Sequence, residues 1–135
     1  MNLLYIEKQL KKEINKSKKN NEVPVAALIV KDDKIIGKGH NKVNKNNSIL
    51  NHAEILAIKK ASRKIKNWRL NDCDMYVTLE PCDMCREIIK KARINKVYYY
   101  SKQNNNKTEL NPTYKYIENN DNFSEELKKF FKEKR

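Results

Sequence analysis

Glycine, proline, cysteine and tryptophan are scarce in this chain, whose 135 residues include only two glycines, three prolines, three cysteines and one tryptophan. Three cysteines are too few for the disulfide framework of a small secreted domain, so we expect a reducing, cytoplasmic environment. No stretch is long and apolar enough to span a membrane. We also expect no secretory signal, because no apolar core with a small-residue cleavage site follows the first lysines; an organellar leader rich in lysine is the alternative.

Features that would divide the chain into parts are also missing. Nothing in the sequence marks a linker or an internal repeat, and a chain of this length has room for one hydrophobic core. We therefore predict a single domain over residues 1–135.

Acidic residues are in the minority. Lysine and arginine total 30 against 17 for aspartate and glutamate, which gives a formal net charge of +13. Such a surface favours a polyanionic partner, and nucleic acid is the natural one. Lysine and asparagine are abundant along the whole chain, as codon bias in an AT-rich genome would produce, so the charge favours nucleic acid by only a small margin.

Hydrophobic periodicity predicts helices that alternate with strands. Helices are expected over residues 1–19, 51–65, 82–93 and, capped by Ser124, 124–135; strands are expected over 23–30, 34–40, 74–79 and 97–100, with 114–118 as a last strand or a connector. Asp32 and Asp33 form the tight turn of a hairpin between the first two strands. Such alternation implies crossovers on both faces of one sheet, so the fold class is α/β: a three-layer α/β/α sandwich around a mixed, largely five-stranded sheet.

The end of the second predicted strand carries the only two glycines, Gly37 and Gly39. We expect the backbone to bend there, or another segment to approach it closely. His40 is expected to be a partly exposed residue at the strand end. Asn41 follows, and its amide either bonds the edge of a purine or stabilises a turn; both interpretations stay open.

Aromatic residues outside the core also admit two interpretations. Trp68 lies in a connector, where it is expected to plug the core rather than to stack on a base. Phe130 and Phe131 lie among lysines near the C-terminus. Either one of them packs on the domain, or the pair forms a basic, aromatic face for unpaired bases. The lone Cys73 is expected to be structural.

Two short segments supply the ligand types of a hydrolytic zinc site. His52 begins the second predicted helix, and Cys82 and Cys85 lie three residues apart at the start of the third, where Pro81 suits a first turn. Residues i and i+3 share one face of a turn, and the positive end of a helix favours thiolates, the form that binds metal. One imidazole and two thiolates leave a fourth position for water. Cobalt or iron would suit the same donors.

Glu54 is a carboxylate that the three ligands do not need. A hydrolytic site must move protons from water to a leaving group, and Glu54 is suitably placed to carry them. A closed Cys/His zinc knot is the structural alternative, but it needs a fourth ligand and usually has other spacings. A disulfide between Cys82 and Cys85 is a weaker alternative in a reducing compartment.

The two segments together resemble the His-x-Glu and Pro-Cys-x-x-Cys signature of zinc-dependent nucleobase deaminases, which is a known pattern and not a deduction from spacing. Further motifs resemble the bacterial tRNA adenosine deaminase (TadA) family: Glu22-Val-Pro-Val-Ala-Ala-Leu-Ile-Val, Gly39-His-Asn, His52-Ala-Glu-Ile, Arg69-Leu70, Tyr76-Val-Thr-Leu-Glu-Pro-Cys and Phe130-Phe131-Lys132. The resemblance covers nearly the whole chain. The first and last motifs are the ones that look specific to the tRNA branch of the cytidine deaminase superfamily.

This resemblance implies a cytidine deaminase-like fold and deamination of adenosine to inosine at the wobble position of a tRNA anticodon, chiefly that of an arginine tRNA, by a homodimer. It makes His52, Cys82 and Cys85 the ligands of one Zn2+ per subunit. Glu54 would take a proton from the attacking water and deliver protons to the purine nitrogen and the departing amine. A loop base that is already unpaired costs little to splay out.

The same resemblance implies a substrate pocket and an RNA surface. Asn41 would contact the purine, with Val25 and the backbone at Ala53 as walls of the pocket. The residues expected to contact the anticodon stem-loop are Phe131, Lys132, Arg135 and Lys102.

The chain departs from the family pattern in two places. After Cys85 the family usually has small residues that permit close helix approach at the dimer interface. This chain instead has Arg86-Glu87-Ile88, and arginine directly after the second cysteine resembles the pattern of cytidine deaminases. After the fourth strand, the family's acidic RNA contact is replaced by Gln103. A deaminase of free nucleobases, nucleosides or nucleotides, of the cytosine or guanine type, is therefore one alternative. A non-catalytic RNA-binding subunit is another, although such a subunit would have no use for Glu54.

Overall fold

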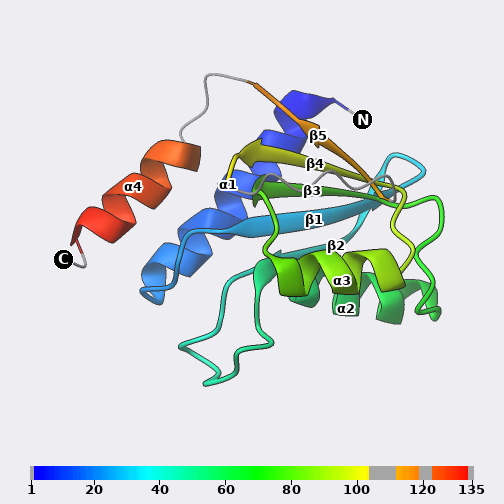
Figure 1. The fold of residues 1–135 in the computed structure, drawn as a ribbon, viewed down its shortest axis with the longest axis horizontal. Coiled ribbons are helices and arrows are strands. Elements are labelled where there is room, and N and C mark those ends of the chain that lie inside the picture. Colours follow the sequence, from blue (N-terminus) through cyan, green and yellow to red (C-terminus); the bar gives the residue numbers. More distant parts are fainter. Residues whose placement is uncertain (1, 104–111, 119–122, 134–135) are drawn as a thin grey trace.

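Five strands form one mixed sheet in the order β2-β1-β3-β4-β5 (Figure 1). The computed structural model describes residues 2–103, 112–118 and 123–133. Its elements are α1 (Leu3–Lys19), β1 (Ala26–Lys31), β2 (Lys34–His40), α2 (Ala53–Ile65), β3 (Asp74–Leu79), α3 (Asp83–Lys91), β4 (Lys96–Ser101), β5 (Thr113–Tyr116) and α4 (Phe123–Glu133). Helices cover both faces of the sheet, so the predicted α/β/α sandwich is confirmed.

The sheet changes from antiparallel to parallel pairing at β3. Strand β1 pairs antiparallel with β2 and β3, whereas β3 with β4 and β4 with β5 are parallel. The hairpin between β1 and β2 turns at Asp32 and Asp33, whose φ angles of 50° and 59° are the left-handed values that a tight turn requires. Because β3 and β4 end at the same edge, Glu80 donates its backbone N–H to the carbonyl of Ser101 over 2.8 Å.

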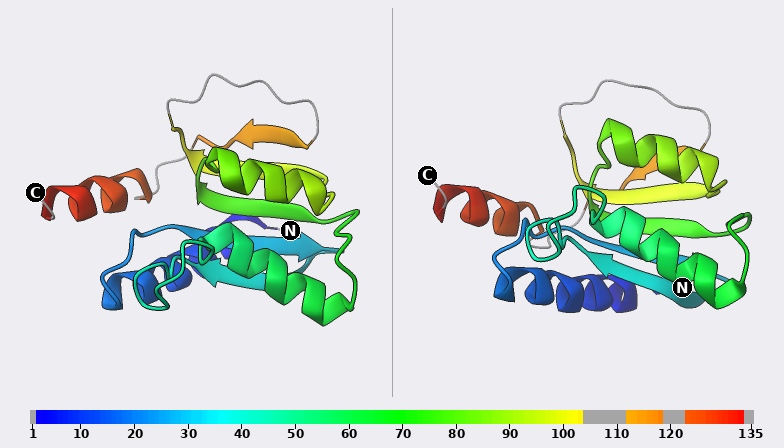
Figure 2. Two further views of the ribbon diagram at one scale, coloured as in Figure 1. Left: turned by 60° about the horizontal axis from the view of Figure 1, so that its bottom comes forward. Right: turned by 90° about the horizontal axis from the view of Figure 1, so that it is seen from below.

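Two apolar layers flank the sheet. Helices α2 and α3 pack on one face, and α1 lies on the opposite face (Figure 2). Successive strand residues point to opposite faces, so Ala27 and Ile29 join the core under α2 and α3, while Leu28 joins Leu10 and Phe123 in the core on the α1 side. Among the described residues, no helix has both the length and the apolar character that a membrane crossing needs.

Helix α2 lies unusually close to β2. A Cβ added at Gly37 would collide with the backbone of Ala57 and Ala61, and one added at Gly39 would collide with the backbone of Ala53 and Ala57. The close approach predicted at these glycines is therefore confirmed. Glycine on the strand and alanine on the helix set the height of α2 above the sheet.

Several local predictions were wrong in detail. Pro81 precedes the N-terminal cap of α3 rather than lying in its first turn. Ser124 is the second residue of α4 rather than its N-terminal cap, and its hydroxyl lies 2.6 Å from that of Ser101 on β4. Residues 114–118 were predicted to form either a last strand or a connector, and the structure has β5 (Thr113–Tyr116) there.

Trp68 does not plug the core, since 53% of its surface is exposed. Leu70 takes the core position of this connector, and its backbone N–H donates to the carbonyl of Ala92 over 2.8 Å. The indole is instead flanked by the guanidinium groups of Arg69 and Arg93, at 4.4 and 5.4 Å from the ring centroid.

His40 is buried, contrary to the prediction of a partly exposed residue. Its Nδ1 lies 3.0 Å from a carboxylate oxygen of Glu13 in α1, and Lys16 donates to the other oxygen over 2.9 Å. Burial alone would raise the pKa of Glu13, but the hydrogen bonds from His40 and Lys16 outweigh burial and lower that pKa from 4.5 to about 2. The ionised carboxylate therefore stabilises the contact between α1 and β2.

We expect Glu13→Gln to lower the free energy of unfolding at pH 7 by about 3 kcal/mol, because each pKa unit corresponds to about 1.4 kcal/mol. The folded-state pKa lies below the unfolded value, so this stabilisation is complete above about pH 4.5 and is lost as the pH falls toward 2. Urea unfolding at pH 7, 4 and 3 measures the free energy of unfolding of both proteins. The difference between wild type and Glu13→Gln should become smaller as the pH falls.

Glu125→Gln is the matched control, because Glu125 is exposed and its contact with Lys128 is 3.7 Å long. It should change stability by less than about 0.5 kcal/mol. A difference between wild type and Glu13→Gln that stays constant from pH 7 to pH 3 would contradict this account of the pair.

Candidate metal centre and substrate pocket

The first turns of α2 and α3 meet at one point. His52 is the N-terminal cap of α2, Cys82 is the N-terminal cap of α3, and Cys85 lies in the first turn of α3. Neither cap residue uses its side chain to bond its own helix. One ligand atom from each of the three residues lies within 4.8 Å of the others. The structure thus brings together the three residues predicted as metal ligands.

The spacing of these donors suits zinc. Zinc–nitrogen and zinc–sulfur bonds of about 2.0–2.1 and 2.3 Å place nitrogen and sulfur about 3.6 Å apart in a tetrahedral site. Nδ1 of His52 and Sγ of Cys85 are 3.6 Å apart. Within the described ranges, no further His, Cys, Asp or Glu joins the group. The residues fit a zinc ion with one position open to a non-protein ligand.

Burial shifts the pKa values of His52 and Cys85. It lowers the pKa of His52, which favours the neutral imidazole that binds metals. Burial, with Glu54 and Cys82 nearby, raises the pKa of the Cys85 thiol far above its usual range. The thiol therefore stays protonated without a cation, and binding of a dication is linked to release of a proton.

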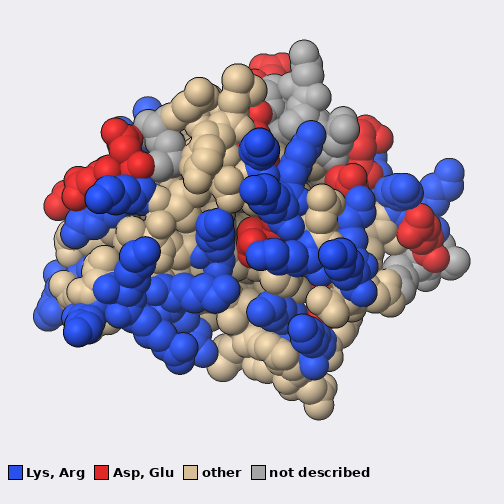
Figure 3. Space-filling view, turned by 180° about the vertical axis from the view of Figure 1, so that it is seen from behind, with Lys and Arg blue, Asp and Glu red and all other residues tan. Residues whose placement is uncertain are grey.

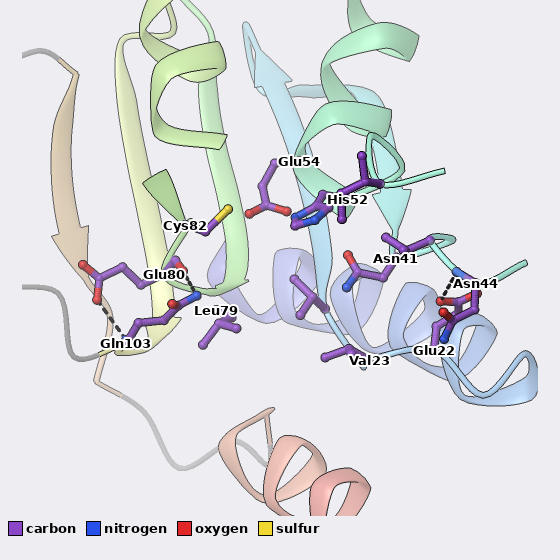
Figure 4. Close-up of a pocket in the computed structure, with 13 residues that line it drawn as sticks. Glu22, Val23, Asn41, Asn44, His52, Glu54, Leu79, Glu80, Cys82 and Gln103 are labelled. Carbon is purple, nitrogen blue, oxygen red and sulfur yellow. Dashed lines mark hydrogen bonds between the residues drawn. The ribbon is translucent and has the colours of Figure 1, made fainter. Parts of the chain in front are cut away.

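Glu54 extends from the first turn of α2 toward Cys82 and His52 (Figure 4). It is 4% exposed. Burial raises its pKa from 4.5 to about 7, although a backbone hydrogen bond and one with Cys85 act in the opposite direction. A carboxyl group with this pKa can both accept and return a proton near neutral pH.

A pocket of about 320 Å³ is lined by His52, Cys82 and Glu54. Val25 and Asn41 lie on its wall, as Figure 4 shows for Asn41. The side-chain oxygen of Asn41 accepts the backbone N–H of Ala53 over 2.8 Å, which turns the amide nitrogen toward the pocket. Ala53 is fully buried and is not among the lining residues, so it supports the wall through Asn41.

Three of the residues predicted to contact RNA, Phe131, Lys132 and Lys102, are not among the residues that line this pocket. Phe131 is 51% exposed and Lys132 is exposed, both on α4, which stands away from α2 and α3 in Figure 1. The amine of Lys102 lies 4.4 Å from the ring centroid of Tyr116. Arg135 lies outside the described residues. Their contact with RNA stays a prediction.

Sequence reasoning missed four residues that shape the site. The buried carboxylate of Glu22 accepts the backbone N–H groups of Asn44 and Lys45 over 3.1 and 2.7 Å, which holds the loop after β2 against the pocket (Figure 4). Beneath Cys82, a second cluster consists of Glu80, Arg86 and Gln103. Helical spacing was the available signal for Arg86, because a residue four positions after Cys82 shares its face.

This fold, with three side chains that could hold a metal ion converging beside a buried carboxylate, is that of a hydrolytic deaminase-type domain. The chain belongs to the family of cytidine and deoxycytidylate deaminase zinc-binding regions, whose model matches residues 2–101. The matched range includes all three candidate ligands and Glu54.

The chain is 44% identical over 95 residues to a tRNA-specific adenosine deaminase of Streptococcus pyogenes, in an alignment that covers 70% of this chain and 60% of that relative. It also matches a structure from a study of A-to-I editing by tRNA:A34 deaminases at the wobble position of transfer RNA, with 30% identity, a TM-score of 0.71 and coverage of 78% and 91% of the two chains. A guanine deaminase of Bacillus subtilis matches with 36% identity, a TM-score of 0.64 and coverage of 71% and 64%. The resemblance predicted from the motifs is confirmed.

We expect the purified protein to hold one Zn2+ per chain, and His52→Ala or Cys82→Ser to retain less than about a tenth of it, because each removes one of three protein ligands. Elemental analysis after dialysis against zinc-free buffer measures this. Cys73→Ala, which changes a buried cysteine outside the cluster, should keep full zinc content. Full zinc content in the ligand variants would refute the assignment.

Proposed function

We propose that this chain deaminates adenosine to inosine at the wobble position of a tRNA anticodon by zinc-dependent hydrolysis. The main support for this proposal is the position of Glu54. Its buried carboxylate faces the converging His52, Cys82 and Cys85 and is not needed as a fourth ligand. The similarity to tRNA-specific adenosine deaminases indicates the substrate. The chain spans about 60% of the length of the Streptococcus relative, so substrate and partners are part of the proposal.

His52, Cys82 and Cys85 would hold one zinc ion per subunit. When bound, zinc would supply a nucleophilic water at neutral pH. Glu54 takes a proton from the attacking water as C6 of the purine is attacked. It delivers this proton to the ring nitrogen, then takes the second proton from the hydroxyl now on C6 and passes it to the amine, so that the C6–N bond breaks, C6 becomes a carbonyl and ammonia leaves. Burial raises the pKa of Glu54 above its ordinary value, which makes the carboxylate a better proton acceptor for this shuttle.

Asn41 and Val25 position the purine. The amide nitrogen of Asn41 can donate to a ring nitrogen, while its oxygen stays bonded to Ala53. Val25 supplies an apolar wall for the face of the base. A base in an anticodon loop is already unpaired, so little energy is needed to bring it into the pocket.

Charge supports the choice of an RNA substrate. The formal net charge is +13, and lysines and arginines are prominent on the face that carries α1 (Figure 3). Phe131, Lys132, Arg135 and Lys102 are the proposed contacts to the anticodon stem-loop. The proposal includes an arginine tRNA as substrate, a single-domain homodimer as the active form and the cytoplasm as its site, which three free cysteines suit.

A deaminase of free bases or nucleosides is the second candidate. Its support is the 36% identity to a guanine deaminase, together with Arg86 and Gln103 at the two positions that depart from the tRNA branch.

Incubation of the protein with an unmodified arginine tRNA that carries an ACG anticodon should yield inosine at the wobble position and one ammonia per inosine. Parallel reactions contain adenosine, cytidine or guanine alone, and these should release little ammonia. Sequencing of the RNA as cDNA locates each inosine. Ammonia from a free base or nucleoside, with unchanged tRNA, would contradict the proposal and favour the second candidate.

Glu54→Gln should lower kcat by at least about 100-fold, because it removes the proton shuttle but keeps the size of the side chain. Zinc content should stay at one per chain, since Glu54 is not a ligand. Glu87→Gln, on the exposed face of α3, is the matched control and should leave kcat unchanged. A Glu54→Gln enzyme that is as fast as wild type would overturn the mechanism.

A further inference from the structure

A buried ion pair lies directly beneath the Cys82 turn. Arg86 is 3% exposed, and its Nη2 donates to a carboxylate oxygen of Glu80 over 2.6 Å. Its Nε donates to the carbonyl of Pro81 over 3.2 Å. One guanidinium group thus holds two consecutive residues of the segment that ends at Cys82.

The same carboxylate also fixes the wall of the pocket. The second oxygen of Glu80 accepts the backbone N–H of Gln103 over 3.0 Å, and the side-chain amide of Gln103 donates to the carbonyl of Glu80 over 2.7 Å (Figure 4). Both Glu80 and Gln103 line the pocket. The two positions at which the chain departs from the family pattern, Arg86 and Gln103, are therefore joined through one side chain.

Stability alone is a poor explanation of this cluster. Removing two charges from water costs about as much as their attraction returns, so a buried ion pair commonly adds no more stability than apolar side chains of the same volume. Arg86 is also incompletely bonded, because its Nη1 has no hydrogen-bond partner among the described residues. The guanidinium carbon of Arg86 lies 4.1 Å from the ring centroid of Tyr114, a contact that further restrains the group.

We propose that Arg86 is a positioning residue for the metal centre: through Glu80 and Pro81 it sets the direction in which Cys82 presents its thiolate, and through Glu80 it fixes Gln103 on the pocket wall. Outer groups that orient metal ligands change metal affinity by about 10- to 100-fold when they are lost. This inference rests on the metal site of the proposed function, but not on the identity of the substrate.

Arg86→Lys is the principal test. Lysine keeps the positive charge but has one terminal nitrogen, so it cannot bond Glu80 and Pro81 with the planar geometry of arginine. Competition with a chelator should show that Zn2+ affinity falls by about 10- to 100-fold. With Co2+ as the probe, the visible absorption of the site should shift or weaken, because the Cys82 thiolate is no longer aligned.

Two further variants separate positioning from folding. Arg93→Lys makes the same substitution at an exposed residue and should leave metal affinity and the Co2+ spectrum unchanged. Glu80→Gln keeps the shape of the carboxylate but removes its charge, and it should lower Zn2+ affinity as Arg86→Lys does. If Arg86→Lys fails to fold, the Zn2+ affinity of Glu80→Gln tests the proposal in its place.

The melting temperature of each metal-free protein provides the reference. A lower melting temperature with Zn2+ affinity and Co2+ absorption within twofold of wild type would overturn the proposal, because the cluster would then serve stability only. A loss of metal affinity beyond that of Arg93→Lys supports it. These readouts need no substrate, so a protein that binds zinc through this cluster but leaves tRNA unchanged would refute the proposed function without refuting this inference.

Discussion

The close contact between α2 and strand β2 is the constraint on which the site depends. Gly37 and Gly39 leave no room for a Cβ beneath the helix, so the backbone of α2 approaches the strand directly. That contact sets the height of the first turn of α2 and hence the positions of His52 and Glu54 above the sheet. The hydrogen bond from Ala53 to Asn41 adds a second restraint at the same end. A wider spacing would separate the imidazole from the thiols.

The other half of the centre depends on the parallel part of the sheet. Strands β3 and β4 end together, so Glu80 bonds to Ser101 and Gln103, and α3 begins directly above them with Cys82 as its cap. The two halves come from different elements, α2 on β2 and α3 after β3. A metal ion held by both would cross-link them, and its binding free energy would add to the stability of the fold.

Sequence patterns predicted the three layers of the fold, the hairpin of the first two strands and the three candidate ligands. These predictions were possible because periodicity and i, i+3 spacing are local properties. They failed where the outcome depends on a partner distant in sequence. His40 was expected to be partly exposed, but Glu13 in α1 supplies a buried carboxylate for it. Ser124 was expected to cap α4, but its hydroxyl instead lies 2.6 Å from that of Ser101 on β4.

Arg86 shows the same limit at the site. The sequence shows Arg86 as a departure from the family pattern on the same helix face as Cys82, but it does not show which residue Arg86 contacts. Its burial against Glu80 depends on how β3, α3 and the loop after β4 assemble, which no local pattern records. The candidate ligands within one segment could therefore be predicted from the sequence, whereas the residues that orient those ligands could not.

We propose that His52, Cys82 and Cys85 form a three-ligand metal site with one position open for the reacting water. X-ray absorption spectroscopy of the zinc-loaded protein tests it most directly. The account predicts two sulfur neighbours at about 2.3 Å and two nitrogen or oxygen neighbours at about 2.0–2.1 Å, of which only one shows the scattering pattern of an imidazole. A third sulfur or a second imidazole would mean a closed, structural site and would contradict the account.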